Sequence, residues 1–426
     1  MSARPACPIA KKAASAVNHD RLQARIAALA RFGGRDDGGV SRETLTDHDR
    51  AARRYLIDEA LALGCQVMVD DCANLYFRRA GAADLPPVLT GSHIDTQPVG
   101  GKLDGAYGVL AGLEVIAALN DGRIQTRHPV EVVAWTNEEG CRFGPGAMGS
   151  SAFVQADRLA GFRESSDGDG IRFGDALDHA LSELTDIARA PLGRALAAYL
   201  ELHIEQGPVL EQAQVPLGVV TGIQGVRWYR IVCKGQAAHA GTTPMDRRGD
   251  AMITAIGIAQ RLHAQATESP VPLRVTLGRW LVQPNSINTI ADQVTFSIDA
   301  RSPDDVALNR FEAFLAQTIN QNEGLTRAQY ERFFQKSPTI FDAGLLAMVA
   351  QACDHVCLVT GHDAPLHLNS GAFHDAMYLA QHCPSAMIFV PSEGGISHNA
   401  AEATDPESLT LGARALAYAV TCRAAG

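Results

Sequence analysis

The feature that most constrains the fold of this chain is a repeated alternation of short apolar runs with longer amphipathic segments. Strand-length apolar runs include PVLTG, VEVVAW, AYLEL and SAMIFV, and segments with helical spacing follow from residues 104, 150, 208 and 406. Parallel strands need long crossover connections, which are usually helices. The sequence therefore predicts an α/β fold with a mostly parallel sheet, preceded by helical spacing over residues 17–63.

The pattern changes after residue 223, where the runs alternate apolar and polar residues. WYRIVCKG, RVTLGRWLV and QVTFSIDARS have the spacing of half-buried strands, and helical spacing covers residues 249–266. This order predicts a β-α-β-β-like insert with a small antiparallel sheet. We therefore expect a catalytic domain formed by residues 1–222 and 334–426, interrupted by a lid-like domain at residues 223–333.

Composition and charge narrow the class of protein. The chain has 426 residues, of which 46% are hydrophobic and 20% charged, as in packed globular proteins. Its formal net charge is -10 and it has no block of lysine or arginine, which argues against nucleic acid or anionic membrane as a partner. A small-molecule substrate is the expected partner.

The sequence also bears on the cellular location of the protein and on the redox state of its cysteines. No apolar run is expected to span a bilayer, and the first twenty residues lack a signal-peptide core, so a cytoplasmic location is expected. The nine cysteines are an odd count without a CxxC pair. This favours reduced thiols over a disulfide framework or a thiolate zinc site.

Histidine and acidic residues follow four predicted strands, at the edge where open α/β sheets bind ligands. These residues are His93 and Asp95, Glu138 and Glu139, His203 and Glu205, and His398, with Asp104 opening a helix. Alone, each has an ordinary explanation, such as a solvated loop histidine or a helix N-cap. Two divalent ions that share one carboxylate need about five or six nitrogen and oxygen ligands, and these residues together supply that set.

The consecutive acidic residues Glu138 and Glu139 can have two different roles, one as a metal ligand and the other as a general base. Neighbouring side chains at a strand end point in different directions, so one can bind metal while the other takes a proton from water. Asp95 lies two residues after His93, where its carboxylate could accept the far ring N–H and fix the tautomer.

Five separated motifs carry a resemblance to a known family. GSHIDTQPVGGKLDG, TNEEGCRFGPGAMGS, LHIEQGPVLE, GQAAHAGTTPM and GISHNAAE resemble the M20 metallopeptidase-like hydrolases, in particular their hydantoinase/carbamoylase branch. That branch includes N-carbamoyl-L-amino-acid hydrolases, β-ureidopropionase and allantoate amidohydrolase. The resemblance runs from about residue 20 to the C-terminus. It implies a Zn-peptidase-like catalytic domain, interrupted by a smaller α+β domain that acts as lid and as the homodimer contact.

The resemblance also implies roles for individual residues. His93, Asp104 and His203 would hold one ion and Asp104, Glu139 and His398 the other, with Asp104 bridging, Glu138 as general base and Asp95 orienting His93. The two ions would be Zn2+ by default, with Mn2+, Co2+ or Ni2+ as alternatives. Related peptidases usually have glutamate where this chain has His203, which favours the amidohydrolase side of the family.

Further positions match the family's substrate contacts. His239 would stabilise an oxyanion, in its own or the partner's active site, and Arg301 would bind a carboxylate through its guanidinium fork. The other matching positions are Gln206, Asn288, Ser370, Gly371 and Ala372. Trp228 stands where allantoate enzymes tend to have arginine, and Phe373 where the family more often has glycine. We interpret His374 and Asp375 as structural.

The predicted reaction is hydrolysis of the carbamoyl C–N bond of an N-carbamoyl-L-amino acid, giving amino acid, CO2 and NH3. A hinge is expected near residues 222–225 and near residue 333. Allantoate amidohydrolase and β-ureidopropionase stay open as alternatives. Trp228 and Phe373 disfavour allantoate. A dipeptidase is more remote because of His203, and a non-enzymatic metal-binding protein is more remote because Glu138 and all the ligands are intact.

Overall fold

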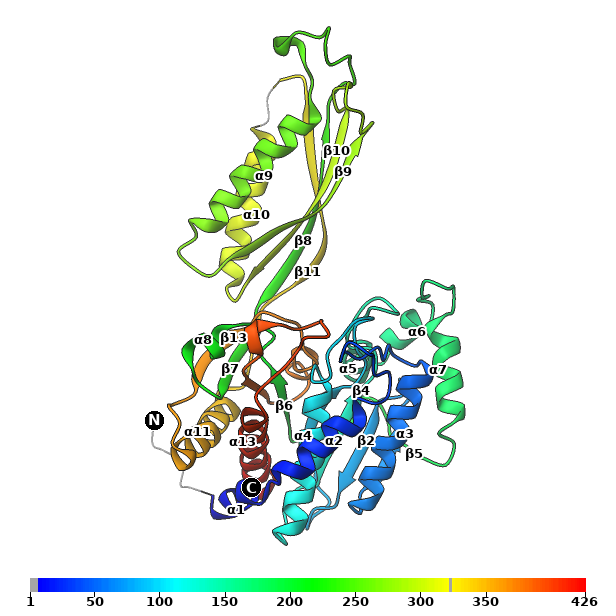
Figure 1. Ribbon diagram of the computed structural model, residues 1–426, viewed down its shortest axis with the longest axis vertical. Coiled ribbons are helices and arrows are strands. Elements are labelled where there is room, and N and C mark those ends of the chain that lie inside the picture. Colours follow the sequence, from blue (N-terminus) through cyan, green and yellow to red (C-terminus); the bar gives the residue numbers. More distant parts are fainter. Residues whose placement is uncertain (1–6, 322–323) are drawn as a thin grey trace. The chain divides into compact units, whose positions relative to one another are not determined.

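The computed structural model describes residues 7–321 and 324–426. The chain divides into two compact units, one formed by residues up to Thr221 together with Ile340–Gly426, the other by Gly222–Thr339 (Figure 1). Residue 333, the expected end of the insert, lies inside the strand β11 (Arg327–Lys336), so the insert extends further than its predicted boundary. The first six residues, part of the segment used to argue against export, lie outside the described residues.

A ten-stranded sheet forms the centre of the first unit, with the order β12-β7-β14-β6-β3-β4-β2-β1-β5 and β13 paired with β7. The four strands β14, β6, β3 and β4 are mutually parallel, which confirms the predicted mostly parallel sheet. The strands are β1 (Gln66–Val69), β2 (Leu75–Arg79), β3 (Val88–His93), β4 (Val130–Trp135), β5 (Ala188–Arg189), β6 (Ala198–Ile204), β7 (Gly218–Ile223), β12 (Thr339–Ile340), β13 (Leu366–Ser370) and β14 (Ser385–Val390).

The helix α4 (Ala106–Asp121) is the centre of the helical layer of this unit. It packs directly on β3, β4 and β6, and α1, α2 and α13 pack on it in turn. Sandwiched in this way, α4 is apolar around almost its whole circumference. The other helices are α1 (Pro8–Ala16), α2 (His19–Leu29), α3 (Asp47–Ala62), α5 (Met148–Val154), α6 (Arg158–Phe162), α7 (Phe173–Ser182), α8 (Val209–Ala213), α11 (Ala343–Thr360), α12 (Ala376–Leu379), α13 (Pro406–Ala425) and the 3-10 turn η2 (Glu393–Gly395).

One helix departs from the expectation about apolar runs. Among the helices that the structure describes, α11 alone is long and apolar enough to cross a membrane, with a mean hydropathy of 1.5 over its 18 residues. It packs against α13 and β14. A core helix passes the same test of length and composition, so this single helix is weak evidence for a membrane span.

The second unit is a four-stranded antiparallel sheet with the order β11-β8-β10-β9, as Figure 1 shows. The predicted β-α-β-β-like order was incomplete, because α10 and β11 follow β10 and make the order β-α-β-β-α-β. Side chains of α9 and α10 pack on one sheet face, and alternate burial along β10 leaves the other face open. The elements are β8 (Gly225–Lys234), η1 (Met245–Arg247), α9 (Ala251–Thr267), β9 (Arg274–Gln283), β10 (Gln293–Ser302), α10 (Asp305–Asn320) and β11.

Candidate metal centre

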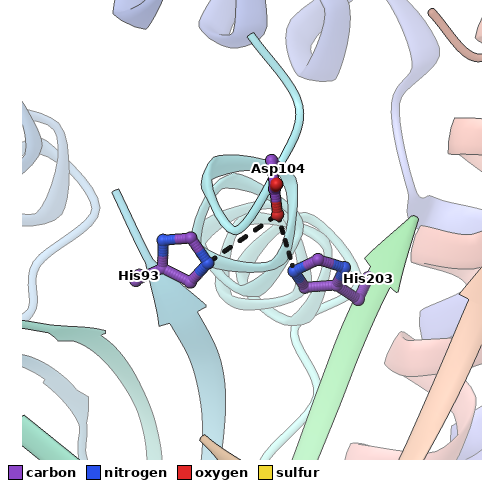
Figure 2. A group of neighbouring side chains, drawn as sticks. All are labelled: His93, Asp104 and His203. Atoms are coloured by element: carbon purple, nitrogen blue, oxygen red, sulfur yellow. Dashed lines mark ion pairs between the residues drawn. The ribbon is translucent and has the colours of Figure 1, made fainter. Parts of the chain in front are cut away.

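The carboxyl ends of two neighbouring parallel strands bring the first histidines together. His93 is the last residue of β3, and His203 lies one residue before the end of β6. The apolar run PVLTG stops at Gly91, whereas β3 continues through His93. Both rings are buried, and Asp104 approaches them from the turn that precedes α4 (Figure 2).

The two oxygens of Asp104 face two different groups of side chains. Oδ1 lies 3.2 Å from His203 Nε2 and 3.8 Å from His93 Nε2 (Figure 2). Oδ2 lies 3.2 Å from His398 Nε2, which is itself 3.5 Å from Glu139 Oε2. Each group can place its ligand atoms within 4.8 Å of one another. A carboxylate divided in this way is what two neighbouring cations would share.

Main-chain carbonyls set the tautomers of the two buried histidines. Nδ1 of His93 lies 2.9 Å from the Asp95 carbonyl, and Nδ1 of His203 lies 2.9 Å from the Ile204 carbonyl. A carbonyl only accepts, so each Nδ1 donates, and Nε2 is the ring nitrogen that faces the shared carboxylate and is available to a metal ion there. The N–H of Gly105 also donates to Nε2 of His203 at 3.2 Å. Burial lowers the pKa of His93 to about 4, which keeps that ring neutral.

Asp95 acts on the site differently from the prediction. Its carboxylate is 3.8 Å from Nδ1 of His93, and the carbonyl is the group that accepts the ring N–H. The carboxylate instead accepts the main-chain N–H groups of Glu138 and Glu139, each at 3.2 Å. Asp95 therefore links the loop that carries both glutamates to the strand end that carries His93.

This geometry predicts the effect of replacing Asp95 with asparagine. The amide keeps one acceptor for the glutamate loop and loses the other, while the carbonyl that orients His93 stays. We expect kcat to fall about 10- to 100-fold with the metal content unchanged. Metal analysis and steady-state kinetics on the same sample check this. Loss of metal at unchanged kcat per bound ion would instead mean that the carboxylate acts through His93.

Buried carboxylates give the site a strong need for cations. Burial raises the pKa of Glu138 well above its usual range, with repulsion from Asp375 and Glu139 adding to the effect. Burial and the Asp104 carboxylate raise the pKa of Glu139 to about 8. Burial would also raise the pKa of Asp104, but its hydrogen bonds with the surrounding histidines outweigh it and lower that pKa well below the usual value. Divalent cations would offset this charge, and the imidazole and carboxylate donors fit them.

Two predicted residues beside the ligands have separate roles. Gln206, with a positive φ of 58°, directs its side-chain amide to Asp104 Oδ2 at 2.9 Å and to Ser397 Oγ at 3.2 Å. Glu205 turns away and accepts the N–H groups of Val209 and Leu210 at the start of α8, which is a structural role. The structure therefore brings Gln206, and not Glu205, to the metal centre.

The end of β13, at Ser370, and the residues that follow it also reach this region. Ser370 Oγ lies 2.9 Å from Nε2 of His374 and accepts the N–H of Ala372 at 3.1 Å. The ring of His374, interpreted from sequence as structural, packs edge-on against His203 with 4.5 Å between centroids. Ser370, Gly371 and Ala372 thus form a turn beside a metal-binding histidine candidate.

Sequence reasoning missed two buried acids near the candidate ligands. Glu201 lies on β6 and binds Ser92 Oγ and the N–H of Ala376. Glu402 accepts the N–H groups of Leu103 and Asp104 at 2.9 and 3.1 Å. An acidic side chain inside the wholly buried strand β6 was a usable signal for Glu201. The signal for Glu402 was weaker, because it follows His398 in an ordinary polar loop.

The other candidates belong to the second unit. His239 forms an isolated bridge with Thr289, and the N–H of Ala240 donates to the carbonyl of Asn288 at 3.0 Å, so His239 and Asn288 lie on paired segments. Trp228 and Arg301 lie on the neighbouring strands β8 and β10. Their meeting with the metal centre of the first unit stays a prediction.

Comparisons with known proteins place the whole chain in a family. The model of the family described as Peptidase family M20/M25/M40 matches residues 89–421. The N-carbamoyl-L-amino-acid amidohydrolase of Rhizobium meliloti is 37% identical over 95% of this chain and 96% of its own length. The allantoate amidohydrolase of Bacillus subtilis (strain 168) is 34% identical over 91% and 93%. The crystal structure of an amidase of the hydantoinase/carbamoylase family from Burkholderia multivorans has a TM-score of 0.87 and 41% identity, covering 96% and 98% of the two chains.

Proposed function

Because this chain belongs to the M20/M25/M40 peptidase family, and within it to the hydantoinase/carbamoylase branch, we propose that it hydrolyses N-carbamoyl-L-amino acids. Water cleaves the ureido C–N bond, and the products are the L-amino acid, carbon dioxide and ammonia. The observation that carries the proposal is Asp104, whose two oxygens face two groups of candidate metal ligands while Glu138 is left outside both groups.

Two divalent ions are part of the proposal. His93, Asp104 and His203 would hold one, and Asp104, Glu139 and His398 the other, with Zn2+ as the first choice and Mn2+, Co2+ or Ni2+ as alternatives. When bound, such ions polarise a carbonyl group and make water a better nucleophile at neutral pH.

Glu138 is assigned the proton transfers. Its Oε2 lies 3.6 Å from Nε2 of His93, so it borders the centre without belonging to either ligand group. The carboxylate of Asp95 accepts the main-chain N–H of Glu138, which fixes the backbone from which the Glu138 side chain extends. A pKa raised by burial favours proton uptake near neutral pH. Glu138 takes the proton of the attacking water and passes it to the leaving amine.

His239 is assigned the oxyanion. The N–H of Gly241 donates to Nδ1 of His239 at 3.0 Å, so Nδ1 is an acceptor and the proton of the neutral ring is on Nε2. That N–H is a donor suited to the negative charge that develops on the ureido oxygen.

Replacing His239 with alanine removes this donor and leaves both ligand groups intact. We expect kcat to fall about 10²- to 10³-fold with two ions still bound. His263→Ala is the matched control, because His263 is an exposed histidine on α9 of the same unit. Equal losses in the two variants would contradict the assignment, and kinetics beside metal analysis distinguish the cases.

Arg301 is assigned the substrate carboxylate, with Asn288 and Gln206 as further contacts. Asp299 accepts from Nε of Arg301 at 3.1 Å and from Nη2 at 2.8 Å, which fixes the plane of the guanidinium. A substrate carboxylate therefore cannot bind Nε of Arg301 without displacing Asp299. The expected bidentate hydrogen bonding of the substrate has to involve the Nη groups.

The test follows ammonia and amine release from the metal-loaded protein. N-carbamoyl-L-amino acids, N-carbamoyl-β-alanine, allantoate and a dipeptide are offered separately at equal concentration. The proposal predicts that an N-carbamoyl-L-amino acid has the highest kcat/KM. Turnover of allantoate or of the dipeptide alone would overturn the substrate assignment and leave the hydrolytic centre in place.

Assembly and location complete the proposal. We propose a homodimer that forms through the second unit, in the cytoplasm, following the family resemblance and the small anionic substrate. Light scattering on the purified chain measures the assembly directly. A monomer at micromolar concentration would contradict it.

A further inference from the structure

The open face of the four-stranded sheet in the second unit carries a groove of about 550 Å3. This volume falls within the range of about 300–1,000 Å3 common for small-molecule pockets. The residues that define it come from all four strands and are Trp228, Arg230, Arg279, Leu281, Asp299 and Phe333.

Aromatic side chains make one wall of the groove rigid and apolar. Trp228 packs on Phe334 with 4.6 Å between ring centroids, and Phe333 stands 6.1 Å from Trp228. The indole Nε1 of Trp228 is buried and has no hydrogen-bond partner among the described residues. Trp228 therefore offers the groove its ring and not a hydrogen bond.

The charges beside this wall are largely neutralised. The guanidinium of Arg230 lies 5.2 Å from the ring centroid of Phe333 and pairs with Glu331 at 2.9 Å. At the other end, Asp299 pairs with Arg301 at 2.8 Å. Arg279 adds a cation at the rim. An acidic ligand would meet Asp299, whereas an apolar ligand meets ring and aliphatic surface.

Exposed apolar side chains support a ligand role for this face. Leu281 is 58% exposed and Phe333 is 46% exposed, although both line the same groove. Exposed apolar residues that are gathered in one place, and not scattered singly, are typical of binding sites.

The groove begins beside the proposed carboxylate site. Arg301 and Asp299 lie two residues apart on the open face of β10, about 7 Å along the strand. Asp299 is directly opposite Trp228 on β8. In an α-amino acid the carboxylate and the side chain leave the same carbon atom. A substrate whose carboxylate binds Arg301 can therefore lay its side chain along the sheet toward Trp228.

We propose that this groove binds the substrate's side chain and that the preferred substrates are N-carbamoyl-L-amino acids with large apolar side chains, aromatic or branched aliphatic. The inference rests on the proposed function and adds the substrate class to it. In this proposal the metal centre determines the reaction, and the groove determines the specificity for the amino-acid side chain.

The test compares kcat/KM for the N-carbamoyl derivatives of L-phenylalanine, L-leucine, glycine and L-aspartate. We expect the phenylalanine and leucine derivatives to exceed the glycine derivative by about 10-fold or more. Trp228→Ala should lower the phenylalanine-to-glycine ratio by about 10-fold, and Phe333→Ser, a change at a half-exposed position, should lower it in the same direction. Gln329→Ala is the control, because Gln329 is exposed on β11 and does not line the groove.

A second readout does not depend on turnover. The product L-phenylalanine should inhibit the wild-type enzyme competitively, and its inhibition constant should rise about 10-fold in Trp228→Ala. A wild-type preference for glycine or aspartate derivatives, or an unchanged ratio in both variants, would overturn the groove assignment alone. Absence of turnover with every N-carbamoyl amino acid would overturn the proposed function, and this inference with it.

Discussion

Replacing Glu138 with glutamine is expected to lower kcat by about 10²- to 10⁴-fold while both ions remain bound. The amide has nearly the same shape as the carboxylate but cannot take a proton from water. Because Glu138 lies outside both ligand groups, metal content should not change. Ammonia release under saturating substrate, beside metal analysis of the same sample, measures both quantities.

Glu205→Gln is a matched control for this change, since Glu205 is an acidic residue at another strand end that caps α8. Activity of the control should stay near the wild-type level. If Glu138→Gln retains activity within about 10-fold, the base is another group. If that variant loses an ion, Glu138 is a ligand and the division between Glu138 and Glu139 is wrong.

Replacing Asp104 with asparagine should remove activity and weaken the binding of both ions. Each oxygen of the carboxylate faces one ligand group, and the amide nitrogen of asparagine cannot act as the second oxygen. After dialysis we expect less than one ion per chain. The rise in melting temperature on adding Zn2+, which follows from binding to the folded state, should also shrink.

The variant His398→Ala tests whether Asp104 is a ligand of both ions, because His398 is expected to bind one ion only. His398 belongs to the second group only, so this variant should keep the ion held by His93 and His203. If Asp104→Asn and His398→Ala lose the same number of ions, Asp104 is not shared. Metal analysis of the two dialysed variants side by side decides this.

The fold class and the candidate ligands could be predicted because their signals are local. Apolar runs that end in histidine or acidic residues mark the carboxyl edge of a parallel sheet, and His93, Glu139 and His203 all lie at that edge. The length of β3 could not be read in the same way. Its last residues are small or polar, and Gly91 stands at φ 138°, where a Cβ atom would collide with the carbonyl oxygen of Val133.

The second unit shows where local patterns mislead. Strand β11 lies at the edge of a sheet whose one face is open, so its sequence RAQYERFFQK is mostly polar and lacks a clean alternation. The helix α10 had a signal that the sequence reading did not use, because Asp304 caps it by accepting the N–H of Val306.

Contacts between side chain and main chain are also invisible in sequence. The spacing of His93 and Asp95 predicted a contact between them, but it could not say that the carbonyl would accept the ring N–H. In the same way, the match at Arg301 could not show that Asp299 occupies the Nε edge of its guanidinium. The sequence therefore predicted which residues lie near one another, and the structure identified which of their atoms are in contact.

The central claim is that Asp104 would be shared between two bound ions and that the chain, with both ions in place, hydrolyses the ureido bond of an N-carbamoyl-L-amino acid. The most direct measurement is a titration of chelator-treated protein with Zn2+, while amino acid and ammonia release are followed with the best N-carbamoyl substrate. We predict that activity rises to a plateau after two equivalents of ion per chain. Full activity after one equivalent, or activity without added ion, would contradict the account.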